Sequence, residues 1–233
     1  MNIVITGASR GLGAAIAEKF ASEGHQLFLS SKDPSRLDQA VNQLKKKYPS
    51  SKIKSRTADV SDKQAILELA DWIISQQTEI DVLVNNAGSF IPGNSHDEPD
   101  GALEKMIAVN LYSAYHLTRK ILPLMMTRKS GHIFNLCSIA SLQAYENGGA
   151  YSISKFALLG FTRNLREEMK PHNIKVTAII PGAVYTDSWS ESGVSRDRIM
   201  QPHDIAGLVY TAANLSPQAC VEEIVVRPQL GDL

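Results

Sequence analysis

The chain has 233 residues, of which 43% are hydrophobic, and its 24 basic side chains balance its 24 acidic ones. No block of like charge occurs, so the composition gives no electrostatic support for a nucleic-acid or membrane-surface partner, and we expect a small-molecule ligand. A chain of this length can remain one doubly wound α/β domain, although length alone leaves the number of domains open.

Cysteine usage and the start of the chain favour a cytoplasmic protein. Cys137 and Cys220 are the only cysteines, and they form neither a CxxC pair nor a zinc-ligand spacing, which favours reduced thiols. An apolar run follows Met1 without a basic leader, and no run approaches the ~18 apolar residues that a membrane-spanning helix requires. We therefore expect a soluble chain, and its histidines and acidic residues show no metal-binding pattern.

Apolar runs and helical patterns alternate along the chain. The apolar runs predict strands at residues 2–6, 26–30, 53–60, 81–88, 131–138, 175–182 and 222–228. Helical patterns fall between the strands, at about residues 14–24, 34–47, 61–73, 99–126 and 151–169, and after residue 203.

Local signals refine this assignment. Asp33 before Pro34 is typical of an N-cap followed by a proline in the first helical turn. Pro123 should bend or end the long helix of residues 99–126. The third predicted strand, residues 53–60, is less apolar than the others and should lie nearer an edge of the sheet.

The alternation of apolar strands and helices indicates a parallel sheet that is covered on both faces, with right-handed crossovers. No repeat, low-complexity tract or proline-rich linker divides the sequence, so we predict a single domain over residues 1–233. Residues 183–201 contain turn formers and lack periodicity, and we interpret so long a loop as a flexible lid over a ligand.

A glycine-rich turn follows the first predicted strand. Residues 6–13 read T-G-x-x-x-G-x-G, with glycines at positions 7, 11 and 13. Glycine allows a tight turn and close approach of the backbone to a pyrophosphate, which the amino end of the following helix would attract. The spacing differs from the general G-x-G-x-x-G fingerprint, and a glycine that merely permits a turn is the alternative interpretation.

The end of the second predicted strand indicates which dinucleotide would bind. An acidic residue here normally accepts the ribose 2′-hydroxyl of NAD, whereas positive charge suits the 2′-phosphate of NADP. In this chain the strand ends in Ser30, Ser31 and Lys32, and Arg10 of the glycine turn can reach the same place. We therefore favour NADP over NAD, with two ordinary solvated cations as the alternative.

The segment from Ser138 to Lys155 carries groups that are suited to proton transfer. Tyr151 and Lys155 stand four residues apart, so a helix would place the phenol and the ammonium on one face. A phenol held beside an ammonium can serve as a proton donor. Without further context, such a pair is more often a simple helix pair, and Asn110 is more often a surface or helix-pairing asparagine.

The motifs together resemble the short-chain dehydrogenase/reductase family over essentially the whole length. The glycine turn, N-N-A-G at residues 85–88, a serine thirteen residues before Y-x-x-x-K, and P-G at residues 181–182 occur in the order and spacing of that family. This resemblance implies a Rossmann-type, doubly wound, seven-stranded parallel sheet that binds a nicotinamide dinucleotide across its carboxyl edge. It also implies a catalytic tetrad of Asn110, Ser138, Tyr151 and Lys155.

The resemblance further implies cofactor contacts along that edge. Asp59 and Val60 would lie near the adenine, and Pro181, Gly182 and Thr186 would lie near the nicotinamide amide. For Asp59, an ordinary strand end before a helix cap is the alternative. The expected contacts are Gly7, Ser9, Arg10, Gly11, Leu12, Gly13, Ser31, Lys32, Asp59, Val60, Asn86, Gly88, Tyr151, Lys155, Pro181, Gly182 and Thr186.

The implied reaction pairs hydride transfer to a carbonyl carbon with proton donation from Tyr151 to its oxygen. A free phenol titrates near ~10, so neutral-pH work calls for a lower pKa. Lys155 and the positive nicotinamide favour the phenolate, and a shift of ~3 units corresponds to ~4 kcal/mol. Ser138 would hydrogen-bond the substrate oxygen, Lys155 would hold the ribose, and Asn110 would hold a water for proton resupply.

Substrate identity rests on weaker signals. The segments PGAVYTDSW and EEIVVRPQLGD resemble bacterial sepiapterin-reductase-type members, in which a carboxylate near the carboxyl terminus anchors the pterin. Asp232 is the candidate counterpart, with a solvated terminal acid as the alternative. A carrier-protein substrate would favour a basic patch, but Arg196 and Arg198 are interleaved with Asp197.

We therefore favour NADPH-dependent reduction of a small ketone or dicarbonyl, sepiapterin among the candidates, by a homodimer or homotetramer. The first alternative is a 3-oxoacyl-[acyl-carrier-protein] reductase. A non-catalytic NADP-binding regulator is a second alternative, which would ordinarily have lost one of the four catalytic side chains that are all present here.

Overall fold

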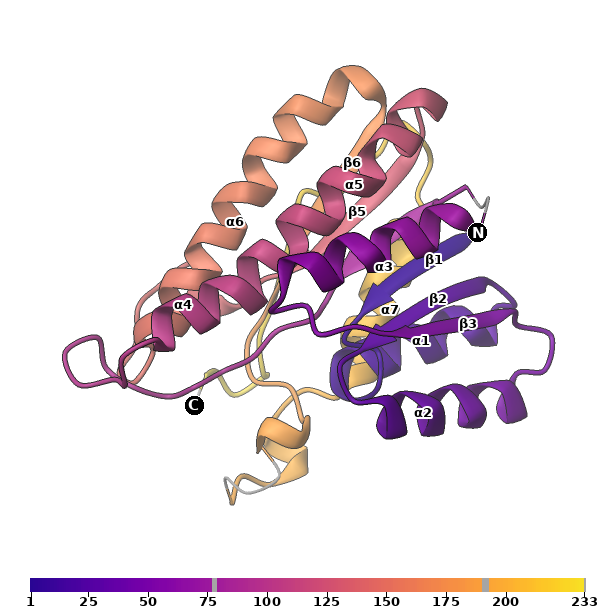
Figure 1. Ribbon diagram of the computed structural model, residues 1–233. Coiled ribbons are helices and arrows are strands. Elements are labelled where there is room, and N and C mark those ends of the chain that lie inside the picture. Colours follow the sequence, from indigo (N-terminus) through magenta and orange to yellow (C-terminus); the bar gives the residue numbers. More distant parts are fainter. Residues whose placement is uncertain (77–78, 190–192, 233) are drawn as a thin grey trace.

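The chain folds around one parallel sheet. The computed structural model describes residues 1–76, 79–189 and 193–232, whose strands are hydrogen-bonded in the order β3-β2-β1-β4-β5-β6-β7 (Figure 1). The strands are β1 (Asn2–Thr6), β2 (Gln26–Ser31), β3 (Ile53–Thr57), β4 (Val82–Asn85), β5 (Gly131–Leu136), β6 (Ile174–Pro181) and β7 (Glu223–Val226). The predicted doubly wound, seven-stranded parallel sheet is confirmed, and β3 lies at an edge as expected.

Helices cover both faces of this sheet. α1, α2 and α7 pack on one face, and α3, α5 and α6 pack on the other (Figure 1). The helices are α1 (Gly11–Ser22), α2 (Pro34–Lys47), α3 (Lys63–Ser75), α4 (Ala102–Ile107), α5 (Ser113–Arg128), α6 (Gly149–Met169) and α7 (Pro202–Ala213). Asp33 caps α2 as predicted, since its side chain accepts a hydrogen bond from the Arg36 N–H.

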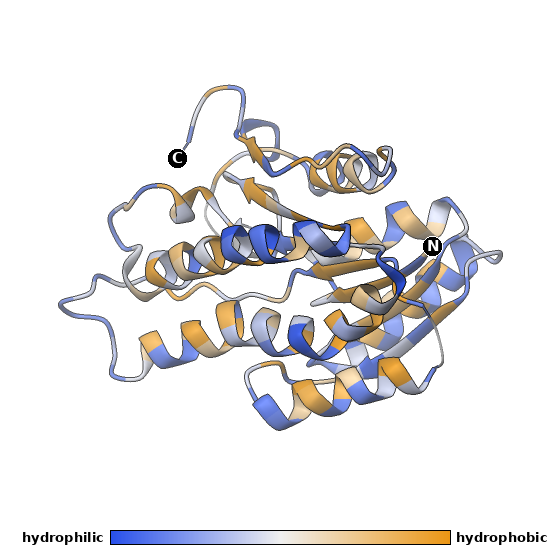
Figure 2. Cartoon of the chain, turned by 90° about the horizontal axis from the view of Figure 1, so that it is seen from above, coloured by the Kyte–Doolittle hydropathy of each residue, from blue (hydrophilic) through white to orange (hydrophobic). Residues whose placement is uncertain are grey.

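Alternating side chains of the central strand fill both layers. Ile3 and Ile5 are completely buried in the cluster that includes α1 and α7, whereas Val4 is buried on the opposite face with α3 and α5. Figure 2 shows the same pattern, with hydrophobic strands between helices of mixed character. Each such burial contributes about 1.5–3 kcal/mol, so apolar packing holds the carboxyl ends of the strands in fixed positions.

The predicted helix over residues 99–126 differs most from expectation. It is divided into α4, a π-helical turn η1 (Ala108–Tyr112) and α5, and the Ser113 N–H donates to the Ala108 carbonyl across five residues. Pro123 does not end the helix but lies inside α5. The complete burial of Ile121 in the core offsets the one backbone hydrogen bond that a proline removes.

The third strand is shorter than predicted. It stops at Thr57 because the Asp59 carboxylate accepts hydrogen bonds from the Ser61 N–H at 3.0 Å and the Ser61 hydroxyl at 2.7 Å, which turns the chain toward α3. Asp62, and not Ser61, caps α3, since its carboxylate accepts from the Gln64 N–H at 2.9 Å.

Residues 183–201, the predicted lid, contain two short 3-10 helices, η4 (Asp187–Trp189) and η5 (Arg196–Arg198). The Tyr185 N–H donates to the Met200 carbonyl at 2.8 Å, and the Met200 N–H donates to the Ala183 carbonyl at 3.2 Å. The two ends of the segment are therefore held side by side beyond β6. Residues 190–192 of the predicted lid lie outside the described residues, and its movement stays a prediction.

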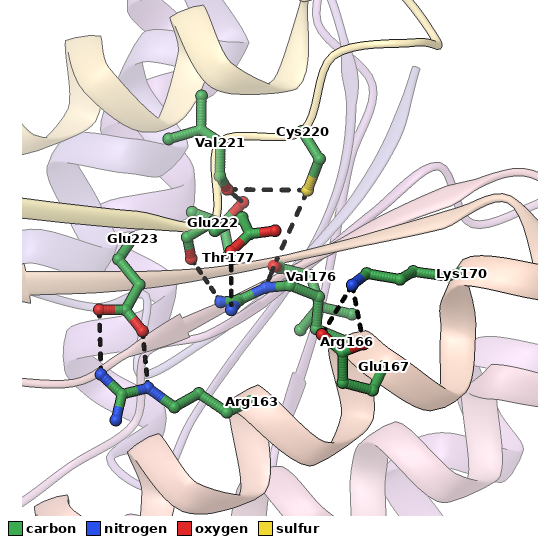
Figure 3. A network of polar contacts seen from close by, with 10 residues as sticks. All are labelled: Arg163, Arg166, Glu167, Lys170, Val176, Thr177, Cys220, Val221, Glu222 and Glu223. Atoms are coloured by element: carbon green, nitrogen blue, oxygen red, sulfur yellow. Dashed lines mark hydrogen bonds and ion pairs between the residues drawn. The ribbon is translucent and has the colours of Figure 1, made fainter.

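Two arginines tie the carboxyl half of α6 to the edge of the sheet (Figure 3). Arg163 donates to both carboxylate oxygens of Glu223, at 2.7 and 3.2 Å. Arg166 is buried, and its guanidinium donates to the carbonyls of Val176 at 2.9 Å and Glu222 at 2.5 Å. Because these bonds are charge-assisted, they fix the far end of the helix whose amino end carries the predicted catalytic residues.

Candidate active site

Three of the four predicted catalytic side chains meet where β5 ends and α6 begins. Ser138 lies two residues beyond β5, while Tyr151 and Lys155 lie in the first two turns of α6. The Lys155 ammonium donates to the Leu136 carbonyl at 2.7 Å and lies 5.7 Å from the centre of the Tyr151 ring. Lys155 is only 5% exposed, so its charge is held in place by the end of the strand.

A short capping box fixes Ser138. Its hydroxyl accepts a hydrogen bond from the Ala140 N–H at 3.2 Å, and its own N–H donates to the Ser141 hydroxyl at 3.2 Å. Both bonds belong to the 3-10 helix η2 (Ile139–Ser141), which directs the chain away from β5. The Ser138 hydroxyl also interacts with the Tyr151 phenol.

Burial controls the protonation of the tyrosine and the lysine. It raises the pKa of Tyr151, and the interaction with Ser138 opposes that rise. It lowers the pKa of Lys155 to about 8. The expected lowering of the phenol pKa depends on a bound nicotinamide as well as on Lys155, so it stays a prediction.

Asn110 joins the same site through the π-helical turn. It is 1% exposed, and its side chain accepts from the Ser89 N–H at 2.8 Å and donates to the Ser89 carbonyl at 3.0 Å. It also donates to the Ser154 hydroxyl at 2.9 Å, and that hydroxyl donates to the Tyr151 carbonyl at 2.7 Å. Of the two alternatives for Asn110, its burial excludes a surface asparagine, whereas its hydrogen bond to Ser154 of α6 is a helix-pairing contact. Periodicity gave no signal for the π turn.

Gly88 lies between the asparagine and the lysine. A Cβ atom there would be 3.3 Å from the Asn110 amide oxygen and 3.6 Å from the Lys155 ammonium. Glycine therefore leaves the space beside these two polar groups open.

The glycine turn has the backbone that its sequence predicts. Gly7 and Gly11 adopt φ values of +65° and +57°, which favour glycine. A Cβ atom at Gly13 would lie 2.2 Å from the Gly7 carbonyl oxygen and 2.4 Å from the Asn86 amide nitrogen, so α1 can start this close to β1 only with glycine there. The Leu12 side chain packs toward the core, so only the backbone of Leu12 is left to contact a ligand at the turn.

Asn86 and Thr6 hold this turn against the end of β4. The Asn86 amide donates to the carbonyls of Thr6 at 2.9 Å and Gly7 at 3.1 Å. The Thr6 hydroxyl in turn accepts from the N–H groups of Asn86 at 3.1 Å and Ala87 at 3.0 Å. The contact of Thr6 with residues 86 and 87 was not predicted. A hydroxyl at the end of β1, opposite the polar end of β4, could have indicated it.

The cationic residues at the β2 end are exposed. The Ser9 and Ser31 hydroxyls are 2.8 Å apart, so the glycine turn adjoins the end of β2 as expected. Arg10 is 57% exposed and donates to the Asp187 carboxylate at 2.8 Å, a partner that the sequence did not indicate. Lys32 is exposed.

The predicted adenine-side residues have structural partners within the chain. Hydrogen bonds from Ser61 lower the pKa of Asp59, and the Lys32 charge contributes to the same shift. Val60 is partly buried against the core on the α3 face. Their contact with adenine stays a prediction.

The residues after β6 lie near the carboxyl-terminal segment. The Gly182 N–H donates to the Val226 carbonyl at 2.8 Å, and a Cβ atom at Gly182 would lie 2.9 Å from an oxygen of Asp232. That oxygen is buried without a hydrogen-bond partner among the described residues, while the other one pairs with Arg227. Thr186 lies 3.4 Å from the Cβ position of Gly11, which brings the segment after Pro181 next to the glycine turn.

In residues 1–76, 79–189 and 193–232, no group of three or more His, Cys, Asp or Glu side chains is arranged to hold a metal ion. No helix in the same ranges has the length and apolar character to cross a membrane.

Residues 1–196 match the family model described as short chain dehydrogenase, and the chain belongs to this family of oxidoreductases. The sepiapterin reductase of Chlorobaculum tepidum is 33% identical over 239 residues, which cover 99% of this chain and 97% of that protein. An uncharacterized oxidoreductase of Staphylococcus saprophyticus is 32% identical over 225 residues, or 97% and 96% of the two chains. A metagenomic short-chain oxidoreductase, crystallised in complex with NADP, matches with a TM-score of 0.86 at 33% identity, covering 98% of this chain and 97% of that one.

Proposed function

We propose that the protein reduces a small-molecule ketone or other carbonyl to an alcohol with NADPH. The observation that carries this proposal is the placement of Lys155 and Tyr151 on one face of α6, with the Ser138 hydroxyl beside the phenol at the end of β5. A carbonyl oxygen that approaches Ser138 and Tyr151 would meet two hydroxyl groups at once. Such a pair can hold the oxygen and deliver a proton to it.

Each polar side chain has a distinct part in this mechanism. Ser138 donates a hydrogen bond to the carbonyl oxygen, and Tyr151 transfers its proton to that oxygen as negative charge develops there. Lys155 stabilises the resulting phenolate and binds the ribose, and Asn110 holds a water through which the phenol regains its proton. NADPH, when bound, supplies the hydride to the carbonyl carbon.

The residues at the amino end of α1 fit a dinucleotide. The absence of a Cβ at Gly13 lets α1 begin close to β1, so the backbone of the turn can approach a pyrophosphate. No acidic residue occupies the first turn of α1, and β2 ends in serines before the cation of Lys32. This charge distribution supports NADP over NAD, with Arg10 and Lys32 at the 2′-phosphate.

For the substrate we propose a small ketone or dicarbonyl, with sepiapterin among the candidates because of the Chlorobaculum relative. Asp232 would anchor a hydrogen-bond donor of the substrate, since its carboxylate lies beside Gly182 near the end of β6. A 3-oxoacyl thioester is the second candidate. We also propose one cofactor-binding domain over residues 1–233, a cytoplasmic location and a homodimer or homotetramer.

A substrate panel with NADPH tests this proposal directly. Diketones, sepiapterin and acetoacetyl thioesters should be compared by the loss of NADPH absorbance. We expect turnover of at least one diketone or sepiapterin and weaker turnover of the thioesters. Faster turnover of thioesters would favour the oxoacyl reductase, and NADPH binding without turnover of any substrate would favour the regulator.

A further inference from the structure

The segment after β4 reaches across to the start of α6. The Gly93 N–H donates to the Asn147 carbonyl at 3.2 Å, and the Asn147 N–H donates to the Asn94 side chain at 3.0 Å. Four residues further along, the Glu98 carboxylate accepts a hydrogen bond from the Ala150 N–H at 3.0 Å. Three hydrogen bonds therefore join residues 93–98 to residues 147–150.

The last of these bonds serves the amino end of α6. The N-cap residue of this helix is Gly148, which has no side chain to accept from the free N–H groups, and no acidic residue lies in the first turn. Glu98 supplies the missing carboxylate from a distant part of the chain. A carboxylate at this end of a helix is favoured by the helix dipole as well as by the hydrogen bond.

The contact is closely packed. A Cβ atom at Gly149 would lie 2.5 Å from the Gly93 carbonyl oxygen and 2.6 Å from the Glu98 carboxylate. A Cβ atom at Gly93 would lie 2.9 Å from the Glu98 side chain. The Glu98 side chain thus fits against two glycines, its carboxylate against Gly149 and its Cβ against Gly93, and no larger residue fits at either place without a shift.

Tyr151 directly follows the residue that Glu98 holds. Its ring also packs edge-on against Phe90 of the same segment, with the ring centres 5.0 Å apart. The carboxyl half of α6 is fixed separately by Arg163 and Arg166. Glu98 is therefore the side chain that accepts a hydrogen bond from a backbone N–H of the first turn of α6, from which the phenol projects.

We propose that Glu98 is a positioning residue for Tyr151, which holds the phenol at the distance that proton transfer to the carbonyl oxygen requires. The proposal rests on the proposed function, in which Tyr151 is the proton donor. A small displacement of a reacting group lowers the rate of the chemical step more than it weakens cofactor binding.

The main test compares Glu98→Ala with Glu98→Gln, which keeps an acceptor oxygen, and with Glu104→Gln, an exposed carboxylate in α4, as the control. We expect kcat for carbonyl reduction to fall about 10- to 100-fold in the alanine variant, while the Kd for NADPH changes less than about twofold. The glutamine variant should recover most of the lost kcat. A wild-type kcat in Glu98→Ala, or equal losses in the alanine and glutamine variants, would overturn the proposal.

Amide hydrogen exchange in the cofactor-free protein tests the contact without relying on activity. The Ala150 and Tyr151 amides should exchange faster in Glu98→Ala than in the wild type, with no change in Glu104→Gln. Unchanged exchange would show that Glu98 does not fix this turn. A Tyr151→Phe variant with full activity would instead refute the proposed function, whatever the exchange result.

Substitution of the glycine provides a second variant in case Glu98→Ala folds poorly. Gly149→Ala should lower kcat by displacing Glu98, whereas Gly160→Ala in the same helix should not, because nothing lies within 4 Å of its Cβ position. Equal kcat values for the two glycine variants would contradict the proposal.

Discussion

The two halves of the sheet's carboxyl edge are built differently. Near the ends of β4 and β5, Lys155 is 5% exposed and donates to a strand carbonyl, and Asn110 is 1% exposed and makes three hydrogen bonds with Ser89 and Ser154. Beyond β1 and β2, Arg10 is 57% exposed and pairs with a carboxylate from the segment after β6. The proposed proton-delivery half is therefore set by packing, while the proposed phosphate-binding half relies on exposed charges that can exchange partners. Substitutions should have large effects in the first half and graded effects in the second.

The largest effect is expected for Tyr151→Phe. Loss of a positioned general acid should lower kcat about 10²- to 10⁴-fold, because the phenol is the only proton donor proposed for the alkoxide. The Kd for NADPH should stay within about twofold of the wild type, since the ring and its packing remain. Steady-state kinetics and fluorescence titration measure both values. A variant that keeps wild-type kcat would contradict the role of Tyr151 as the proton donor.

A buried histidine near the amino end of β5, away from the carboxyl edge of the sheet, should limit stability in acid. Burial lowers the pKa of His132 on β5 to about 3, so the folded chain keeps this ring neutral while the unfolded chain binds a proton below pH ~6.5. Its contribution to stability is full above that pH and is lost as the pH falls. We expect the free energy of unfolding to drop by up to about 1.4 kcal/mol per pH unit between pH 6 and 4.

Urea titrations of the wild type and His132→Gln at several pH values measure this dependence. The free energy of unfolding of the variant should depend less steeply on pH because the variant lacks the His132 ring. The other acid-sensitive groups remain in both proteins. Identical slopes would assign the acid sensitivity to residues other than His132.

A smaller effect is expected for Arg10→Ala in the phosphate half. Loss of one charge-assisted hydrogen bond should weaken NADPH binding about tenfold and leave NADH binding nearly unchanged. Arg36→Ala is the matched control, since Arg36 is an exposed arginine of α2 that pairs with Asp33. Equal weakening of both cofactors, or NADH binding at least as tight as NADPH binding in the wild type, would contradict the proposed 2′-phosphate site.

The smallest effect is expected for Asp187→Asn. Asp187 holds Arg10 in an ion pair, so its neutralisation should free Arg10 for the 2′-phosphate and tighten NADPH binding by up to about fivefold, the range of an exposed ion pair. The gain should disappear in the Arg10→Ala background, which a double-mutant cycle measures. Weaker NADPH binding in Asp187→Asn would mean that the carboxylate orients Arg10 for the cofactor.

Signals that lie within a few residues of one another were predicted well. The N-cap at Asp33, the apolar run of β1, and the spacing of Tyr151 and Lys155 depend on local backbone geometry, and the structure contains each of them. The apolar strands likewise indicated the parallel sheet, because burial on both faces requires a continuous apolar run.

Features that depend on distant contacts were not predicted. Asp187 pairs with a residue 177 positions away in the chain, and Glu98 with one 52 positions away, so no local pattern marks either of them. The burial that raises the pKa of Tyr151 was not predicted either, since it follows from tertiary packing.

The π-helical turn before α5 has a consequence for length changes in this part of the chain. One extra residue in a helix rotates everything beyond it by about 100° relative to everything before it. Met106, ahead of the turn, packs with Ala150 of α6, whereas Leu117, beyond it, packs in the core under the sheet. Deletion of a single residue from the turn would leave one of these side chains facing away from its partners, so the helix does not tolerate shortening here.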